Sequence, residues 1–93
     1  VEPAAASNGL LKLAFEAYDA NDRVRAKERF NKVLEVNPNQ PQAHYYLAML
    51  YVNEGATGEA RSHLERFLAL APNGPEAETA REMLKQLGKI KND

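Results

Sequence analysis

The chain repeats itself at a fixed distance of 34 residues. Identical pairs at this offset include Leu13-Ala14 with Leu47-Ala48, Ala26 with Ala60, Leu34 with Leu68, Pro38-Asn39 with Pro72-Asn73, and Pro41 with Pro75. A period of this size is typical of stacked supersecondary units, each of which buries its apolar face against its neighbours. We therefore expect one unit at residues 7–40 and a second at residues 41–74. A third unit starts at residue 75 and stops half-way.

Each unit is expected to contain two helices. Apolar residues recur at helical spacing, and no segment alternates with the period of two that a half-buried strand requires. Gly55 suits the left-handed residue that ends a helix, and Asp22 and Thr57 suit N-caps. Pro41 and Pro75 suit the first turn of a helix, where the missing N–H has no partner to lose. We predict an all-α chain with five helices, near residues 8–20, 23–36, 41–54, 58–71 and 75–87.

Two series of residues share one pattern of spacing. The second unit reads His44-x₂-Leu47-Ala48-x₂-Tyr51, then Ala60-x₃-Leu64 and Pro72. The first unit reads Leu10-x₂-Leu13-Ala14-x₂-Ala17, then Ala26-x₃-Phe30 and Pro38. Both resemble the tetratricopeptide repeat, W-x₂-L-G-x₂-Y, then A-x₃-F, then P, with the Trp, the Gly and one Tyr replaced. The resemblance covers residues 7–90 and implies an α-solenoid of antiparallel helix pairs.

The small residues of the pattern predict close helix contacts. We expect Ala14 and Ala48 to lie where the paired helix approaches, with Ala26 and Ala60 opposite them. The larger side chains expected to fill the space between the helices are Leu13, Leu47, Phe30 and Leu64. The Ala-, Arg- and Glu-rich composition is similar to that of bacterial members of the family.

The last helix is expected to close the array. Charged residues replace packing residues at four positions of this helix, namely Glu78, Arg81, Glu82 and Lys85. Burial of an unpaired charge is costly, so we expect these four side chains in water and Leu84 and Leu87 buried. Residues 75–88 are thus predicted to form a polar-backed capping helix, followed by a frayed tail at residues 89–93.

The first helix has a similar polar side. Gly9 and Glu16 stand where the second unit carries Ala43 and Leu50. We therefore expect the array to begin at residue 7, after a flexible leader at residues 1–6.

No arrangement of residues typical of an active site occurs in the sequence. Cys is absent, which excludes a thiolate nucleophile and a disulfide framework. His44 occupies a helix-pairing position and is expected to be packed, whereas His63 is expected on a solvated face with Glu59 and Arg66. No H-E-x-x-H, glycine-rich phosphate loop or G-x-S-x-G occurs. We predict a protein that is not an enzyme and takes no cofactor or metal.

The charge is nearly balanced. Twelve Lys and Arg face 13 Asp and Glu, so the net charge of -1 gives no general attraction to nucleic acid or anionic lipid. A local basic cluster occurs on a second helix, which is convex in the family: Arg23, Arg25, Lys27, Arg29 and Lys32. No aromatic residue other than Phe30, which we assign to the core, interleaves with it, so we expect no nucleic-acid partner. No apolar run is long enough for membrane insertion. The compartment stays open between bacterial cytoplasm and periplasm.

The resemblance implies a concave groove lined by the first helix of each unit. On the side facing away from the paired helix, this chain carries apolar and aromatic residues with polar residues at the rim. The predicted peptide-binding residues are Leu11, Phe15, Tyr45, Tyr46, Met49, Met83, Asn53 and Thr79. The five positions that form the carboxylate clamp of co-chaperones in this family carry Leu11, Phe15, Tyr46, Glu76 and Ala80 here, so that clamp is lost.

We therefore predict a non-catalytic protein–protein interaction module. Its ligand is an apolar or aromatic peptide, or a helix, held in the concave groove. Two alternatives stay open at this point. The same groove can serve self-association, which would make the chain a homodimer or scaffold, or the chain can act as a spacer in a longer polypeptide.

Overall fold

The computed structural model describes residues 3–90 and the side chains of residues 6–88. Its elements in chain order are α1 (Pro3–Asp19), α2 (Arg23–Val36), α3 (Pro41–Glu54), α4 (Thr57–Leu70) and α5 (Ala77–Ile90). No strand occurs in residues 3–90, so the prediction of five helices and an all-α chain is confirmed.

The two outer helices differ from the prediction at their ends. α1 begins at Pro3 rather than near residue 8, because proline is accepted in the first turn and the alanines that follow favour helix. Residues 3–6 of the expected leader are therefore helical. α5 begins at Ala77 rather than at residue 75, after a tight turn in which the Ala77 N–H donates to the Gly74 carbonyl at 3.1 Å. It continues to Ile90 through two residues of the expected tail, and residues 1–2 and 91–93 lie outside the described part.

The turns inside each unit follow from local chemistry. The Asp22 carboxylate accepts the Arg25 backbone N–H at 3.2 Å, which confirms this N-cap. Gly55 ends α3 with a φ of 79°, a left-handed conformation that favours glycine. The expectation for Thr57 was wrong. Thr57 is the first residue of α4, and the cap position is held by Ala56, whose side chain cannot accept a hydrogen bond.

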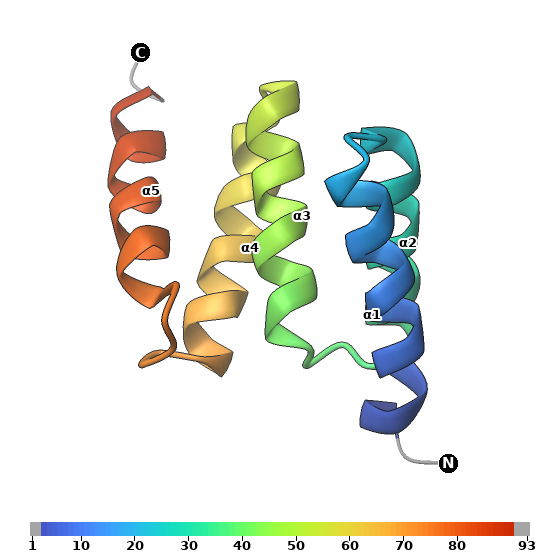
Figure 1. Cartoon of the computed structure of the whole chain (residues 1–93). Coiled ribbons are helices and arrows are strands. Elements are labelled where there is room, and N and C mark those ends of the chain that lie inside the picture. The colour runs from blue at the N-terminus through green and yellow to red at the C-terminus, as the bar shows by residue number, and fades with distance from the viewer. Residues whose placement is uncertain (1–2, 91–93) are drawn as a thin grey trace.

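The helices form two layers. α1, α3 and α5 stand side by side in the front of Figure 1, and α2 and α4 lie behind them. Each helix packs on the next one along the chain, α1 on α2, α2 on α3, α3 on α4 and α4 on α5. The molecule measures 45 × 28 × 20 Å, as expected when helix pairs are added in one direction.

The small residues lie at the helix contacts, as the repeat pattern predicts. Ala14, Ala26, Ala48 and Ala60 are all 0% exposed. Around them lie two buried clusters. The first contains Ala14, Ala17, Ala26, Phe30, Val33, Ala43, Leu47 and Leu50, and the second contains Ala48, Ala60, Leu64, Phe67, Ala80 and Leu87.

Leu13 corrects the prediction that both repeated leucines are buried. Leu47 is 0% exposed, whereas Leu13 is 46% exposed. The reason is that Leu47 packs in one cluster with Phe30 and Val33 of the preceding unit, so its contact crosses the boundary between units. Leu13 belongs to the first unit, and within residues 6–88 no helix of a preceding unit packs on α1 in the way that α2 packs on α3.

The two histidines meet at the junction of the units. The Nδ1 atoms of His44 and His63 lie 2.9 Å apart, and His44 Nε2 lies 2.9 Å from the Pro38 carbonyl in the α2–α3 linker. His44 is buried, as expected. The prediction of a solvated face for His63 was wrong. Its ring is half-buried because it packs on His44 and stacks on Tyr51, with ring centroids 5.6 Å apart and an interplanar angle of 7°.

The last helix has the two faces that the sequence predicts. Glu78, Arg81, Glu82 and Lys85 are exposed, and Leu87 is buried, whereas Leu84 is only partly buried. The Arg81 guanidinium also donates to the Pro72 carbonyl at 2.7 Å, which joins α5 to the α4–α5 linker. None of the five helices of residues 3–90 combines the length and the apolar character needed to cross a bilayer.

Candidate peptide-binding face

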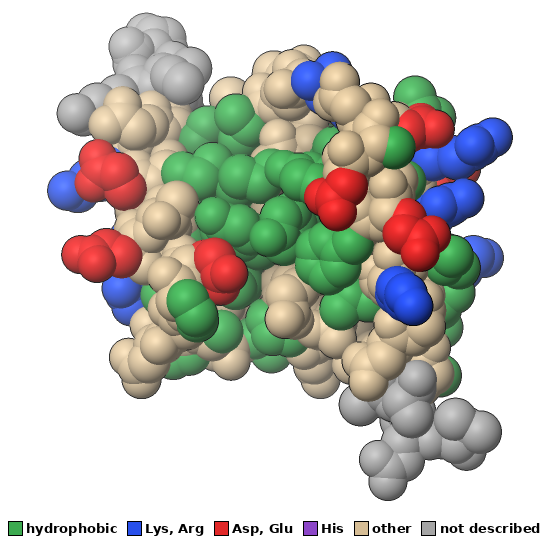
Figure 2. All heavy atoms as spheres, viewed as in Figure 1, with side chains coloured by type: hydrophobic (Ala, Val, Ile, Leu, Met, Phe, Trp, Pro, Cys, Tyr) green, Lys and Arg blue, Asp and Glu red, His purple; other side chains and the backbone are tan. Residues whose placement is uncertain are grey.

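α1, α3 and α5 present an apolar surface on the side that faces the viewer in Figure 2. We call this surface the first-helix face. The predicted binding residues all belong to these three helices and fall into two groups: Leu11, Phe15, Tyr45, Tyr46, Met49 and Met83 are partly buried, and Asn53 and Thr79 are exposed. The polar residues of the prediction are thus the ones most open to water, and the apolar ones keep part of their surface accessible.

Phe15 and Tyr46 connect the first-helix face to the core. Their rings meet edge to face with centroids 4.9 Å apart, and Tyr46 stacks on the buried Phe30 at 5.8 Å and 10°. Both side chains pack against the first buried cluster. They therefore complete the core and remain partly accessible, so the rings are held in fixed positions.

Tyr18 belongs to the same aromatic group and was missed in the sequence. Its ring lies 5.0 Å from that of Tyr46 and 6.3 Å from that of Phe30, both edge to face, and it is partly buried. The signal was present, since Tyr18 stands three residues after Phe15 and so shares its side of the helix.

The α5 side of the first-helix face rests on the second buried cluster. Tyr45 lies 5.2 Å from Tyr46 and 5.0 Å from Phe67, measured between ring centroids. Met49 of α3 and Met83 of α5 pack against this cluster with Tyr45. Thioether side chains are flexible and polarisable, so this half of the surface can adapt its shape to a ligand more readily than the aromatic half.

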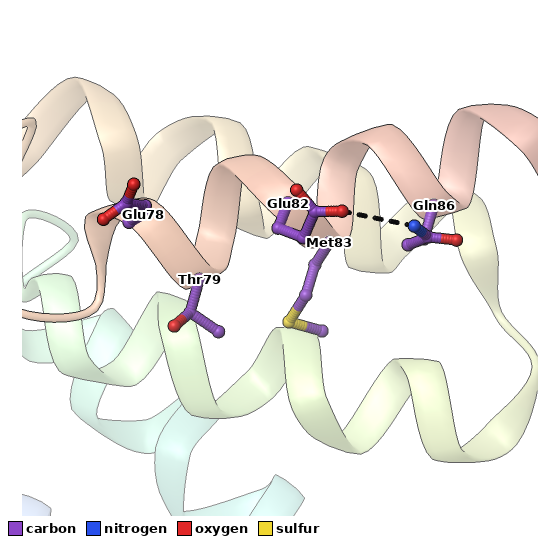
Figure 3. Close-up of a pocket in the computed structure, with 5 residues that line it drawn as sticks. All are labelled: Glu78, Thr79, Glu82, Met83 and Gln86. Atoms are coloured by element: carbon purple, nitrogen blue, oxygen red, sulfur yellow. Dashed lines mark hydrogen bonds between the residues drawn. The ribbon is translucent and has the colours of Figure 1, made fainter.

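A shallow hollow of about 390 Å³ lies along α5. It is lined by Glu78, Thr79, Glu82, Met83 and Gln86. Thr79 and Met83 point from α5 towards α3 in Figure 3, and the Gln86 amide donates to the Glu82 carboxylate at 3.3 Å. Two of the predicted binding residues thus line a depression at the edge of the first-helix face.

The tyrosines stay neutral hydrogen-bonding groups. Burial raises the pKa of Tyr45 and of Tyr46, because the charged phenolate is disfavoured away from water. The carboxylate of Glu76 raises both pKa values further, and that of Asp19 contributes for Tyr46. Glu76 precedes α5 and Asp19 ends α1, so acidic groups from two segments of the chain act on Tyr46.

The basic cluster is largely occupied by contacts within the chain. Lys27 Nζ lies 2.6 Å from Glu54 Oε2, and Arg29 donates to the Leu13 carbonyl at 3.1 Å. Arg25 and Lys32 form exposed ion pairs at 3.8 and 3.5 Å with the neighbouring Asp22 and Glu35. These basic side chains therefore join α2 to neighbouring helices or pair with acidic side chains close by in the sequence. Among the described residues, no three His, Asp or Glu side chains converge as metal ligands would.

The fold is that of an α-helical repeat protein with one apolar face. A family model for the tetratricopeptide repeat matches residues 11–85, and the chain belongs to this family. The chain is also 38% identical over 48 residues to the cellulose synthase operon protein C of Pseudomonas fluorescens (strain SBW25). That match covers 52% of the chain and 4% of the Pseudomonas protein, so the chain spans a small part of this relative's length. Tetratricopeptide repeats are typically non-catalytic modules that bind other proteins, and the fold and family predictions are confirmed.

Proposed function

We propose that this chain binds an apolar or aromatic peptide segment, or a helix, on the first-helix face. The observation that carries the proposal is the set of four neighbouring aromatic rings, Phe15, Tyr18, Tyr45 and Tyr46, all partly accessible. Aromatic residues are enriched at binding hot spots, since they bury a large area at a small cost in side-chain entropy. Here the cost is smaller still, because contacts with Phe30 and Phe67 already hold the rings.

The unit boundaries that we propose agree with binding on this face. We propose two repeats, at residues 7–40 and 41–74, with residues 75–88 as the capping helix. In that arrangement the first helices of all three segments share one face, and a ligand crossing it touches α1, α3 and α5 together. Self-association through the same face is the alternative, and its test is described in the Discussion.

A random dodecapeptide display library panned on the 93-residue chain tests the proposal. We expect an enriched peptide to shift the amide signals of Tyr45, Tyr46 and Thr79 in a titration followed by NMR. Tyr45→Ala should weaken its binding by about 2 kcal/mol if the ring is an anchor. Thr79→Trp should also weaken binding, by obstruction. Because Thr79 is exposed, this variant should retain the stability of the parent chain.

The matched control is the double variant Arg23→Ala, Arg25→Ala on the other layer. It should bind the same peptide with nearly unchanged affinity. Raising the salt concentration from about 0.05 to about 0.5 M should change the affinity only modestly, because screening acts on exposed charges and not on apolar burial. Shifts confined to residues 23–32 that disappear with salt would place the site on α2 and reject the proposal.

A further inference from the structure

The two junctions between second and first helices share one contact. Where α2 is followed by α3, His44 Nε2 lies 2.9 Å from the Pro38 carbonyl of the linker and donates to it. Where α4 is followed by α5, the Arg81 guanidinium donates at 2.7 Å to the carbonyl of Pro72, which stands 34 residues after Pro38. In both places the end of a second helix, with its linker, is bound by the first helix that follows.

The second unit shows what this contact covers. Leu47 is 0% exposed and packs in one cluster with Phe30 and Val33 of α2. On the same unit, the Arg66 guanidinium donates to the side-chain oxygen of Asn39 in the linker at 3.3 Å. The C-terminal half of α2 and its linker therefore supply both the apolar side chains and the hydrogen-bond acceptors that cover this side of the second unit.

The first unit has an open hollow at the corresponding place. We call it the outer hollow. It has a volume of about 180 Å³ and is lined by Leu10 and Leu13 of α1 and by Glu28, Arg29 and Lys32 of α2. The residues of the covered side stand 34 positions later: His44, Leu47, Ser62, His63 and Arg66. The outer hollow is thus the place where the first unit has no cover, and Leu13 is 46% exposed there.

The charge of the outer hollow suits the C-terminal end of a helix. The Arg29 guanidinium is held by the Leu13 carbonyl at 3.1 Å and forms no ion pair among residues 6–88, and Lys32 pairs only with the exposed Glu35. Glu28 opposes these cations in part, but α2 contains five Lys and Arg against two Asp and Glu, a net charge of +3. The free carbonyls at the end of a helix carry partial negative charge and are stabilised by cations.

The segment before α1 differs from the linker before α3. α1 is helical from Pro3, so residues 3–6 continue the helix where the corresponding residues 37–40 form the linker. Glu16 also stands at the position of the buried Leu50, so a unit packed in the register of the repeat would bury its carboxylate. A helix that covers the outer hollow is therefore not joined to α1 in the way that α2 is joined to α3.

We propose that the outer hollow binds the C-terminal end of an amphipathic helix that belongs to a partner protein. An apolar side chain from the last turns of that helix fills the space at Leu10 and Leu13, and the carbonyls at its end accept hydrogen bonds from Arg29 and Lys32. The outer hollow shares no residue with the predicted binding residues of the first-helix face, so this inference stands apart from the proposed function.

A peptide of residues 23–40 provides the probe, because it carries the helix end that covers the second unit. A lactam between Glu28 and Lys32, which are exposed on α2 and one turn apart, keeps this short peptide helical. We expect the fluorophore-labelled probe to bind the 93-residue chain and to shift the amide signals of Leu10 and Leu13 in an NMR titration. Val33→Asp in the probe should abolish binding, because it places a charge in the apolar contact.

Matched variants of the protein test the outer hollow. Leu13→Ala should weaken binding of the probe at least about 5-fold, because apolar contact is lost. Val24→Ala removes a side chain that is 71% exposed on α2 and does not line the hollow, so it should leave the affinity unchanged. Tyr45→Ala, on the first-helix face, should also leave it unchanged. Thermal unfolding of each variant checks that the fold is kept.

Four results would overturn this inference. The first is the absence of binding at about 1 mM probe. The second is an equal loss of affinity in Leu13→Ala and Val24→Ala, which would indicate non-specific contact. The third is loss of binding in Tyr45→Ala, which would place the probe on the first-helix face and leave the proposed function intact. The fourth is a set of shifts confined to residues 43–50, which would mean that the probe replaces α2 within the chain.

Discussion

Leu13 and Leu47 occupy the same position of the repeat and have opposite environments. Leu47 is fully buried in contact with the preceding unit, and Leu13 is 46% exposed. We expect Leu47→Ala to lower the free energy of unfolding by about 2–5 kcal/mol, because it leaves a cavity in a closed cluster. Leu13→Ala should lower it by less than about 1 kcal/mol, since water already reaches this side chain. Urea unfolding followed by circular dichroism measures both changes.

The two leucine variants control for each other, because the chemical change is identical. Similar losses of stability in both would mean that Leu13 is covered in solution, for example by a second molecule. Repeating the measurement at a tenfold lower protein concentration would then separate the two cases, since cover by a second molecule is lost on dilution.

The histidine pair fixes its own protonation in the folded state. The Pro38 carbonyl can only accept a hydrogen bond, so His44 Nε2 carries the proton and donates to it. His44 Nδ1 then accepts, and His63 Nδ1 donates to it across 2.9 Å. His44 is neutral in this arrangement, and His63 keeps the N–H that it donates. A proton added to His44 Nδ1 would place two N–H groups against each other and break the contact.

We therefore expect the protein to lose stability as the pH falls from about 7.5 to 5.5. Burial lowers the pKa of His44 and of His63 below the ordinary value of 6.5. The charge of Arg66 lowers the pKa of His44 further, and that of His44 lowers the pKa of His63 further. The Pro38 carbonyl and the Glu59 carboxylate oppose this in part. As the pH falls, the histidines of the unfolded state bind protons before those of the folded state. The contribution of the histidine pair to stability is therefore fully present above pH 6.5 and is lost as the pH falls through the folded-state pKa.

The urea midpoint at several pH values measures this loss. The parent chain should show a falling midpoint between pH 7.5 and 5.5, a range in which ordinary carboxylates stay ionised. The double variant His44→Leu, His63→Gln should show a nearly constant midpoint over the same range, whatever its absolute stability. An equal slope in both proteins would assign the pH dependence to other groups.

Like α1, α5 packs closely on only one other helix. It packs on α4 through Ala77, Ala80 and Leu87, and its opposite side carries exposed charges. Local opening of such a helix exposes little buried surface. We expect its amides to exchange with deuterium faster than those of α3, which packs on both α2 and α4.

Hydrogen exchange followed by mass spectrometry tests this order of protection. Leu87→Ala should speed exchange in α5 more than in α3, because Leu87 is 3% exposed and holds α5 to the second cluster. Glu82→Ala on the exposed side is the matched control and should change little. Equal protection of α3 and α5 in the parent chain would mean that a further surface covers α5.

The repeat spacing predicted most of the helices. It failed where the environment of a residue depends on another helix, or where a segment has no repeat partner. The buried alanines and the helices at 23–36 and 41–54 follow from the pattern itself, because packing and propensity agree there. His63 was misplaced because its burial depends on His44 and Tyr51 of another helix. It does stand three residues after the buried Ala60 and four before the buried Phe67, so the helical stripe contained a hint. The start of α1 at Pro3 depends on propensity in a segment with no repeat partner.

For the whole molecule, the arrangement of charge bears on self-association. Two copies that paired through the first-helix face with two-fold symmetry would bring identical surfaces together. The carboxylates of Asp19 and Glu76 raise the pKa of Tyr46 on that face, so each copy would set acidic groups near those of the other. Like charges at an interface are unfavourable, and the +3 charge of α2 lies in the other layer and cannot compensate.

We therefore expect the 93-residue chain to sediment as a monomer of 10.4 kDa at about 0.15 M salt and concentrations up to about 100 µM. Asp19→Asn with Glu76→Gln should raise the tendency to dimerise, because the apolar face remains and the repulsion is removed. Adding Tyr45→Ala to this double variant should restore the monomer. Sedimentation velocity at three protein concentrations measures the oligomeric state of all three proteins. A parent chain that dimerises in a Tyr45-dependent manner would instead favour the scaffold function, with the first-helix face as the dimer interface.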